Sequence, residues 1–535
     1  MRLVRALRAH WLMAGAVTVA LVLRALAVLG YPTILWFGDS VGYLRSAVRL
    51  APSGTRPSGY SVLLAVLKPF HSFIVVVTVQ HLLGLAVALM VYALVWRHVR
   101  AAWPRRTLLP GLLGALVAAP VLFDAYQIEL EHLGLSDALF TFLLVAAVVV
   151  LLWRPEVGPR AAAASGGLLG LAAVTRSVGW PLLLLVLAWL FLRRRGKRAL
   201  VVPAAVLTGA YLVPLVLYAG WFYAAHERVA LTNTEKVFLY GRTMDFADCE
   251  VIEPRPELAK MCPKPPPKDV SPAYAALWTK QSPFAEMRGG KAAGNDLAGE
   301  FAFAALKAQP GDYLKVVGRD VVRAFAWERT VYPSPWTFQK YEFPDRTVKL
   351  NKDQARVARA YTGSAGPRKV VEPYAGWMRG YQDHVFLPGT VLGAVLLVGA
   401  AGLLWPGRGA RHRALLPWLV AWALLVVPAA TADFDYRYVL PAMPFAALAA
   451  VLAFVPHRRE REAVLSGAAA APGTGAPAAA RPALPERARR AWRATGPRSP
   501  AGRWRRRSRR GGGSESPAAR ARRAVRARRA APPRR

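Results

Sequence analysis

The sequence is poor in cysteine and in acidic residues. Its 535 residues include only 2 Cys and 31 Asp or Glu, against 71 Lys or Arg. So little cysteine excludes a small disulfide-rich secreted scaffold. Three signatures of soluble enzymes are also missing: a Gly-Lys-Ser/Thr phosphate-binding loop, a Gly-x-Gly-x-x-Gly turn opening a helix, and a histidine pair with zinc-ligand spacing. The sequence therefore argues against nucleotide-binding, dinucleotide-binding and zinc enzymes of these types.

Both cysteines, Cys249 and Cys262, fall in one long polar segment between apolar runs. If this segment faces an oxidising compartment, we expect them to form one disulfide. Such a bridge closes a short loop and stabilises the fold by up to about 3 kcal/mol. The alternative is two unpaired thiols.

Positive charge is in excess, and much of it lies at the C-terminus. The net charge is +40, and residues 457–535 alone contain 23 Arg and 4 Glu. This stretch is rich in Ala, Pro, Gly and Arg and has no apolar stripe, so we expect a disordered basic tail. We expect the tail to contact anionic lipids at the cytoplasmic membrane surface. RNA or another nucleic acid is the less favoured partner, because the basic residues concentrate in this tail.

Long apolar runs dominate the rest of the chain. Hydrophobic residues make up 54% of the sequence, and runs of roughly 18 or more residues can cross about 30 Å of hydrocarbon. We predict an all-α polytopic membrane protein with about ten transmembrane helices. The spans lie at about residues 11–31, 71–96, 108–126, 135–153, 161–176, 178–192, 199–223, 384–405, 413–431 and 438–456.

Arginine and lysine mark one side of the membrane. Basic residues precede the first span and follow the second, fourth, sixth, eighth and tenth. Because such residues accumulate on cytoplasmic loops, we expect a multi-pass protein of the cell membrane with both termini in the cytoplasm. The fifth and sixth spans are short and meet near Arg176. If they formed one broken helix, the basic tail would lie outside, which the charge rule disfavours.

The loops between these basic ones then lie on the outer, extracytoplasmic face. We expect four parts: an N-terminal bundle at 1–223, an outer domain at 224–383, C-terminal spans at 384–456 and the basic tail at 457–535.

The outer domain contains one clear helical pattern, in which Leu314, Val317, Val321 and Phe325 repeat at helical spacing. This pattern predicts an amphipathic helix. The helix could pack on the outer domain or lie along the membrane surface.

Asp39 is the candidate catalytic residue. It follows the first apolar run, where a carboxylate at the membrane surface could act as a general base and accept the proton of an acceptor hydroxyl. The alternative is that Asp39 caps a helix beginning near Ser40, because Asp is a favoured N-cap residue. Position alone favours neither role.

Three arginines at loop edges, Arg56, Arg176 and Arg437, are candidate ligands of a phosphate leaving group. Guanidinium binds phosphate through two parallel hydrogen bonds. The alternative is that these side chains simply extend to the membrane surface, as most such arginines do.

His132 lies near Glu129 and Glu131, which is a weak indication of metal binding. Anchoring of a loop is the favoured role for this histidine. We therefore assign no metal ligand and leave a divalent metal ion open.

The first loop resembles that of the GT-C membrane glycosyltransferases. These include protein O-mannosyltransferases, bacterial aminoarabinose transferases and actinobacterial arabinosyltransferases. The family pattern is an Asp with a Tyr or similar residue four positions on, then a basic residue before Pro-Pro-Gly-Tyr. Here Asp39 and Tyr43 match the first part, and Arg56 to Tyr60 match the second.

Other parts of the chain extend the resemblance, which covers about residues 10–455 in layout. Glu131 and Asp137 match near the start of the fourth span. Arg176 matches after the fifth span, and Arg437 matches before the last.

The resemblance implies a GT-C-like helical bundle and a sugar donor carried on polyprenyl phosphate. It also implies an inverting displacement at the anomeric carbon, with Asp39 as the base. The acceptor hydroxyl could belong to a glycan, a lipid or a protein. The substrate-binding residues would be Tyr43, Arg56, Tyr60, Glu131, Asp137, Arg176 and Arg437.

Two departures from the family pattern affect what the resemblance implies. Ser58 stands where the family has its second Pro, and Ser40 follows Asp39 where arabinosyl and some mannosyl members carry a second acid. The sugar identity and a bound divalent metal therefore stay open.

A transporter or flippase of lipid-linked sugars and a non-catalytic membrane scaffold are the competing hypotheses. A transporter usually has ionisable residues at the membrane midplane and interrupted helices in corresponding halves. Here the acids lie at loop edges and the halves show no symmetry. The composition, rich in Ala and Arg, is typical of a high-GC bacterium, and together with the resemblance it leads us to expect an actinobacterial source.

Overall fold

The computed structural model describes residues 2–193, 197–364, 366, 369–405 and 411–456. Across these residues the chain forms helices, turns and loops, and the one strand-like pairing is an isolated bridge between Leu35 and Leu133. The predicted all-α class is confirmed. The chain divides into two units, Met1–Ala470 and Ala471–Arg535, and every described residue belongs to the first. The predicted basic tail lies outside the described residues.

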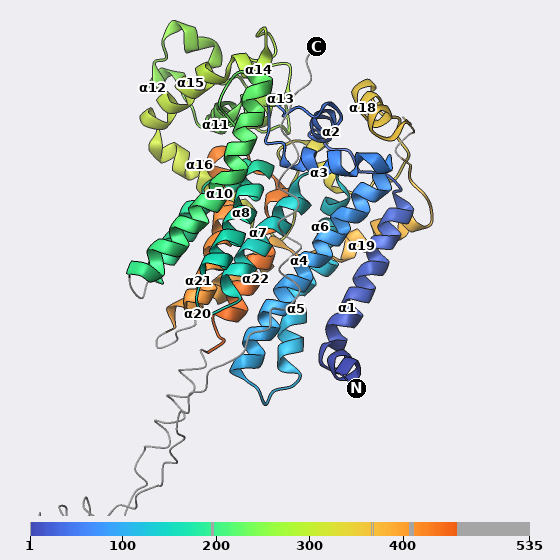
Figure 1. The fold of residues 1–535 in the computed structure, drawn as a ribbon. Helices are drawn as coiled ribbons and strands as arrows, with labels where there is room; N and C mark the ends of the chain where they lie inside the picture. The colour runs from blue at the N-terminus through green and yellow to red at the C-terminus, as the bar shows by residue number, and fades with distance from the viewer. Residues whose placement is uncertain (1, 194–196, 365, 367–368, 406–410, 457–535) are drawn as a thin grey trace, which may run out of the picture. The chain divides into compact units, whose positions relative to one another are not determined.

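The long helices of the first unit run side by side as a bundle (Figure 1). Three stretches between them matter for function: the first loop (residues 31–72), the connecting segment (227–373) and the last loop (432–437). The first loop contains α2 (Ser40–Arg49) and α3 (Gly59–Leu67). The bundle helices are α1 (Arg2–Gly30), α4 (Phe73–Ala102), α5 (Leu109–Phe123), α6 (Ala125–His132), α7 (Asp137–Leu152), α8 (Pro159–Thr175), α9 (Leu182–Leu192), α10 (Lys197–His226), α20 (Gly389–Leu404), α21 (Arg411–Thr431) and α22 (Met443–Leu452).

Among the described helices, four are long and apolar enough to cross a membrane: His10–Gly30 of α1, all of α4, Leu200–His226 of α10 and His412–Thr431 of α21. Two more spans result if bent pairs count as one span each. These are α5 with α6 and α19 (Tyr374–His384) with α20, each bent by 53°. The other predicted spans coincide with the shorter helices α7, α8, α9 and α22. Length and composition therefore support four to six of the ten predicted spans.

Glycine lets α8 and α10 pack at close range. A Cβ at Gly166 would lie 2.2 Å from the carbonyl oxygen of Leu207, and one at Gly170 would lie 2.4 Å from that of Tyr211. No side chain fits at such distances, and small residues commonly allow membrane helices to approach in this way. Gly167, the next residue of α8, has open space around it.

A buried ionic network holds the first loop against the bundle. The guanidinium of Arg24 donates to both carboxylate oxygens of Glu131, at 2.8 and 3.0 Å. His81 lies 2.9 Å from the same carboxylate, and its other ring nitrogen lies 3.2 Å from His132. The second nitrogen of His132 lies 2.8 Å from the carbonyl oxygen of Tyr31, where the loop begins. Buried ionisable groups require partners. His132 has one on each side, and it thereby holds the start of the first loop against α4.

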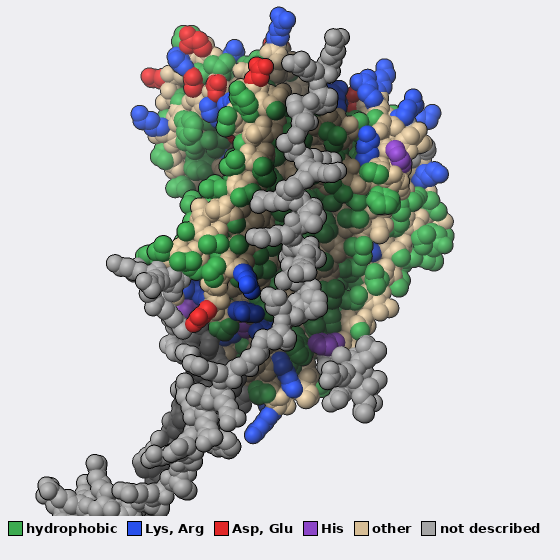
Figure 2. Space-filling view, viewed as in Figure 1, with side chains coloured by type: hydrophobic (Ala, Val, Ile, Leu, Met, Phe, Trp, Pro, Cys, Tyr) green, Lys and Arg blue, Asp and Glu red, His purple; other side chains and the backbone are tan. Residues whose placement is uncertain are grey.

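The connecting segment has a small hydrophobic core of its own, built around Val237, Tyr240 and Phe301. Cys249 and Cys262 form a disulfide beside this core, with Cα atoms 6.1 Å apart. On the face shown in Figure 2, acidic side chains gather over this segment, and hydrophobic side chains cover much of the bundle. Its helices are α11 (Glu235–Thr243), α12 (Cys249–Ile252), α13 (Pro272–Trp278), α14 (Gly290–Ala293), α15 (Asn295–Ala308), α16 (Pro310–Arg323), α17 (Pro335–Phe338) and α18 (Lys352–Thr362).

The predicted amphipathic helix is α16, but its buried face differs from the predicted stripe. Leu314 is 66% exposed, whereas Val316 and Asp320 are buried. The helix packs against α15 and α21. The difference arises because Asp320 pairs with the buried Arg242 of α11, which turns a charged residue inward.

Candidate active site

Asp39 occupies the position just before the first turn of α2, but its side chain makes no capping hydrogen bond. Its carboxylate forms ion pairs with two arginines. One oxygen contacts Arg56, and the other lies 3.3 Å from Nη1 of Arg437. Of the two roles left open by the sequence, capping is therefore not what this side chain performs.

Two opposing effects act on the Asp39 carboxyl. Burial raises its pKa, whereas the positive charges of Arg56 and Arg437 lower it, and the arginines prevail, so the pKa falls to about 2. The side chain is still 22% exposed. Asp39 is therefore ionised at neutral pH and within reach of a ligand. In the free protein it is a weak base, because a base with so low a pKa holds a proton poorly at neutral pH.

Close packing of the first loop against α8 places Arg56 beside Asp39. The loop turns into α3 at Gly59, where a Cβ would lie only 2.7 Å from the hydroxyl oxygen of Thr175. The backbone N–H of Ser58 donates to the hydroxyl of Tyr218 on α10, at 3.1 Å. Glycine at this position thus lets the Arg-Pro-Ser-Gly turn lie directly on the end of α8.

A second acid–base pair lies beside the first. Asp137 begins α7 and is buried, and one of its oxygens contacts Arg176, which directly follows α8. The guanidinium of Arg176 lies 5.3 Å from the ring centroid of Tyr438. Tyr438 follows Arg437 in the chain, so the ends of α7 and α8 meet the residues that enter the last span.

The last loop supplies a third pair. Nε of Arg437 lies 3.2 Å from an oxygen of Asp435, and the hydroxyl of Tyr341 donates to the other oxygen of Asp435. The guanidinium of Arg437 also lies 4.7 Å from the ring centroid of Phe37, two residues before Asp39. These contacts orient Arg437 toward the first loop.

The structure does not bring all the predicted site residues together. The three acid–base pairs described above form one cluster: Asp39, Arg56, Asp137, Arg176, Asp435 and Arg437. The ring of Tyr43 belongs to it, because it lies 5.4 Å from the guanidinium carbon of Arg56. Tyr60 is buried beneath Tyr43 and donates its hydroxyl to Gln80 at 2.5 Å. Glu131 belongs to the buried network of α1, α4 and α6 described above, so it does not face Asp39.

Three residues of the cluster were not among the predicted site residues: Asp435, Tyr341 and Lys291. Asp435 had a sequence signal, because it lies two residues before Arg437 in an acidic loop. Tyr341 and Lys291 had none, because they belong to the connecting segment and reach the site only through the tertiary fold.

Lys291 approaches the cluster from α14. Its Nζ lies 3.1 Å from the ring centroid of Trp278. Burial and the charge of Arg56 lower the pKa of Lys291, and Asp39 acts in the opposite direction, which leaves the pKa at about 7. Lys291 therefore lies within electrostatic reach of the first acid–base pair.

The cluster keeps unfilled hydrogen-bonding capacity. Nε of Arg56 and Oδ2 of Asp137 are buried and make no hydrogen bond, although both residues form ion pairs through other atoms. Buried polar atoms are nearly always hydrogen-bonded, so these two atoms call for a partner such as a water molecule or a ligand atom. Arginine nitrogens of this kind can donate to anionic oxygens.

Metal binding was left open by the sequence. Across the described ranges, no group of three or more His, Cys, Asp or Glu side chains is arranged to hold a metal ion. The positive charge of the cluster comes from its arginines.

No protein-family model matches the chain, and no curated protein matches it. Among solved structures, ArnT from Cupriavidus metallidurans bound to undecaprenyl phosphate is similar at a TM-score of 0.33 and 15% identity, over 85% of this chain and 79% of that one. ArnT from the same organism in the apo state is similar at a TM-score of 0.30 and 15% identity, over 82% and 76%. Similarity at this level carries no argument about function.

Proposed function

We propose that the chain is a membrane glycosyltransferase of the GT-C type, which moves a monosaccharide from a polyprenyl-phosphate donor to an acceptor hydroxyl. The supporting observation is a carboxylate, Asp39, that lies between Arg56 and Arg437 in a protein with membrane-spanning helices. A polyprenyl phosphate is already a competent leaving group. The reaction therefore needs a base, cations for the departing phosphate and alignment of two substrates, but no nucleotide site.

In the proposed reaction the donor phosphate binds Arg56 and Arg437, with Arg176 as a further cation. Asp39 accepts the proton of the acceptor hydroxyl while its oxygen bonds to the anomeric carbon. The bond from that carbon to the phosphate oxygen breaks, its electron pair leaves with the polyprenyl phosphate, and the configuration inverts. A positioned general base typically contributes about 10²–10⁴-fold to the rate.

Donor binding also changes the strength of the base. In the free protein Arg56 and Arg437 neutralise Asp39 and hold its pKa at about 2, against the effect of burial. A phosphate that accepts hydrogen bonds from the same guanidinium groups competes with the carboxylate and brings a like charge close to it. Both effects raise the carboxyl pKa. Asp39 thus becomes a stronger base when the donor is present.

We extend the proposal to orientation and partners. The cluster faces the extracytoplasmic side and both termini are cytoplasmic, which rests on the distribution of Lys and Arg among the loops. The connecting segment is the main part of an outer domain at 224–383, between the bundle at 1–223 and the spans at 384–456. The tail at 457–535 contacts anionic lipids. The acceptor is a glycan, a lipid or a protein.

Release of polyprenyl phosphate from a polyprenyl-phospho-sugar tests the proposal, with purified protein in nanodiscs. Asp39→Asn keeps the size of the side chain but removes the base, so we expect turnover to fall about 10²–10⁴-fold. Asp353→Asn is the matched control, because Asp353 is exposed and lies 3.8 Å from Arg45. Its turnover should match that of the wild type.

Retained turnover in folded Asp39→Asn protein would contradict the mechanism. Movement of the intact lipid across the membrane without cleavage would favour the transporter. Absence of both activities would favour the scaffold.

A further inference from the structure

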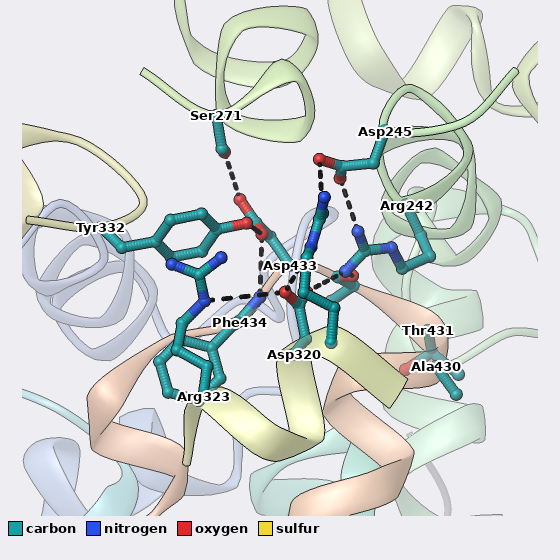
Figure 3. A network of polar contacts seen from close by, with 12 residues as sticks. Arg242, Asp245, Ser271, Asp320, Arg323, Tyr332, Ala430, Thr431, Asp433 and Phe434 are labelled. Carbon is teal, nitrogen blue, oxygen red and sulfur yellow. Dashed lines mark hydrogen bonds and ion pairs between the residues drawn. The ribbon is translucent and has the colours of Figure 1, made fainter. Parts of the chain in front are cut away.

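The connecting segment holds the start of the last loop through a buried ionic network (Figure 3). The guanidinium of Arg242 on α11 is fully buried and lies 2.6 Å from Asp245 and 2.5 Å from Asp320 of α16. The same guanidinium donates to the carbonyl oxygen of Ala432, at 3.2 Å. Arg242 therefore joins two helices of the connecting segment to the first residue of the last loop.

Asp433, the next residue of the loop, is held from the other side. The hydroxyl of Ser271 donates to one carboxylate oxygen at 2.5 Å, and the hydroxyl of Tyr332 donates to the other. Arg323 lies 3.8 Å from the ring centroid of Tyr332 and 3.7 Å from an oxygen of Asp320. The two halves of the network are thus continuous, as Figure 3 shows.

The protonation state of Asp433 depends on the network around it. Burial raises the pKa of Asp433 and the charge of Asp245 adds to this effect, while hydrogen bonds from Ser271 and Tyr332 oppose it, which leaves the pKa at about 7. The network contains three arginines and three aspartates: Arg242, Arg319, Arg323, Asp245, Asp320 and Asp433.

The last loop is short, so contacts that hold Asp433 in place also restrict the position of Arg437 at the active site. Asp433 lies only four residues before Arg437. Between them, Asp435 accepts a hydrogen bond from the backbone N–H of Arg437 at 3.4 Å and pairs with its guanidinium at 3.2 Å. We therefore expect a shift at Asp433 to move Arg437 relative to Asp39.

We propose that Arg242, Asp320 and Asp433 are positioning residues of the active site. Through them the connecting segment sets the place of Arg437 against Asp39 without touching the substrate. A buried charge that loses its partner is strongly destabilising, so the network favours one arrangement of the loop over others. The effect on donor binding rests on the proposed function, whereas the restraint on the loop does not.

Amide hydrogen exchange of the full-length protein tests the restraint. Tyr332→Phe removes one hydrogen-bond donor to Asp433, and Asp433→Ala removes both acceptor oxygens. We expect faster exchange in residues 432–438 in both variants and no change in residues 249–262. Asp312→Asn is the control, because Asp312 lies on α16 and pairs with Lys315 at 2.9 Å outside the network.

Unchanged exchange in residues 432–438 of Tyr332→Phe and Asp433→Ala would overturn the proposal, whatever the substrate is. If Asp433→Ala does not fold, the milder Tyr332→Phe decides the outcome alone.

Binding of polyprenyl phosphate tests the route through Arg437. We expect Tyr332→Phe to weaken binding severalfold, up to about tenfold. In an Arg437→Gln background the same change should have no further effect, because the residue through which it acts is already lost. If Tyr332→Phe weakens binding of polyprenyl phosphate by the same factor in the Arg437→Gln background, Tyr332 does not act through Arg437. If the wild type binds no polyprenyl phosphate, the proposed donor is wrong, and the exchange result still decides the positioning role.

Discussion

Asp39 is a carboxylate that two arginines hold before any substrate binds. Arg56 reaches it from the same loop, and Arg437 reaches it from a position almost 400 residues later in the chain. The three residues form a closed ionic group. In the proposed reaction, a donor phosphate would replace the carboxylate as the partner of the two arginines. On this proposal, Asp39 occupies in the free protein the place that the donor phosphate takes on binding.

This competition predicts opposite effects of one substitution on binding and on turnover. Asp39→Asn removes the charge that competes with phosphate for Arg56 and Arg437, so we expect polyprenyl phosphate to bind about 3–10-fold more tightly while turnover is lost. Titration calorimetry of the detergent-solubilised protein measures the affinity. Asp353→Asn should leave it unchanged. Weaker or equal binding by Asp39→Asn would show that the carboxylate does not compete with phosphate.

At the scale of elements, α8 links two parts of the site, because Thr175 at its end packs against Gly59 of the first loop and Arg176 pairs with Asp137. The contact with α10 depends on glycines that no side chain can replace, at Gly166 and Gly170. Glycines on the same helix therefore differ in whether a side chain fits: none fits at Gly166 or Gly170, whereas Gly167 has open space around it.

Adjacent glycines on α8 provide a matched pair of substitutions. A Cβ at Gly166 meets the backbone oxygen of Leu207 at 2.2 Å, so Gly166→Ala should lower the free energy of unfolding by about 1–3 kcal/mol. Gly167→Ala meets nothing within 4 Å, and we expect it to be neutral or to stabilise by up to about 1 kcal/mol through helix propensity. Thermal unfolding measures both. Equal Tm values for the two variants would argue against close packing of α8 on α10.

At the scale of the whole molecule, the sequence predicted which ionisable residues lie together better than it predicted their surroundings. Asp39, Arg56, Asp137, Arg176 and Arg437 all lie at the edges of apolar runs, where an ionisable group requires a partner or water. That constraint is visible in the sequence, and the structure places these five residues in one cluster.

Other features depend on tertiary contacts and could not be predicted. The burial of Glu131 away from Asp39 is one example, because it depends on Arg24, which lies on another helix, α1. The buried face of α16 follows from Arg242, which belongs to another helix. Several predicted spans are shorter than expected. For example, 3-10 turns at Ser177–Gly179 and Leu440–Ala442 replace the first turns of a regular helix.

The network around Asp433 also makes the stability of the whole molecule depend on pH. Burial and the charge of Asp245 raise the pKa of Asp433 to about 7 in the folded protein, against about 3.9 in an unfolded chain. Between these values the folded protein binds one proton that the unfolded chain does not. The contribution of this residue is therefore full below about pH 4, declines by up to about 1.4 kcal/mol per pH unit and is lost above about pH 7.

Asp433→Asn cannot titrate and serves as the reference for this dependence. We expect the Tm of the wild type minus that of Asp433→Asn to fall as the pH rises from about 5 to 7, and to stay level from about 7.5 to 9. Thermal unfolding of both proteins in the same detergent and buffers measures the difference, because other titrating groups contribute equally to each. A difference that stays constant or rises over the lower range would show that Asp433 is already ionised in the folded protein. Its charge would then be balanced by Arg242 throughout that range, and the network would hold the last loop independently of pH.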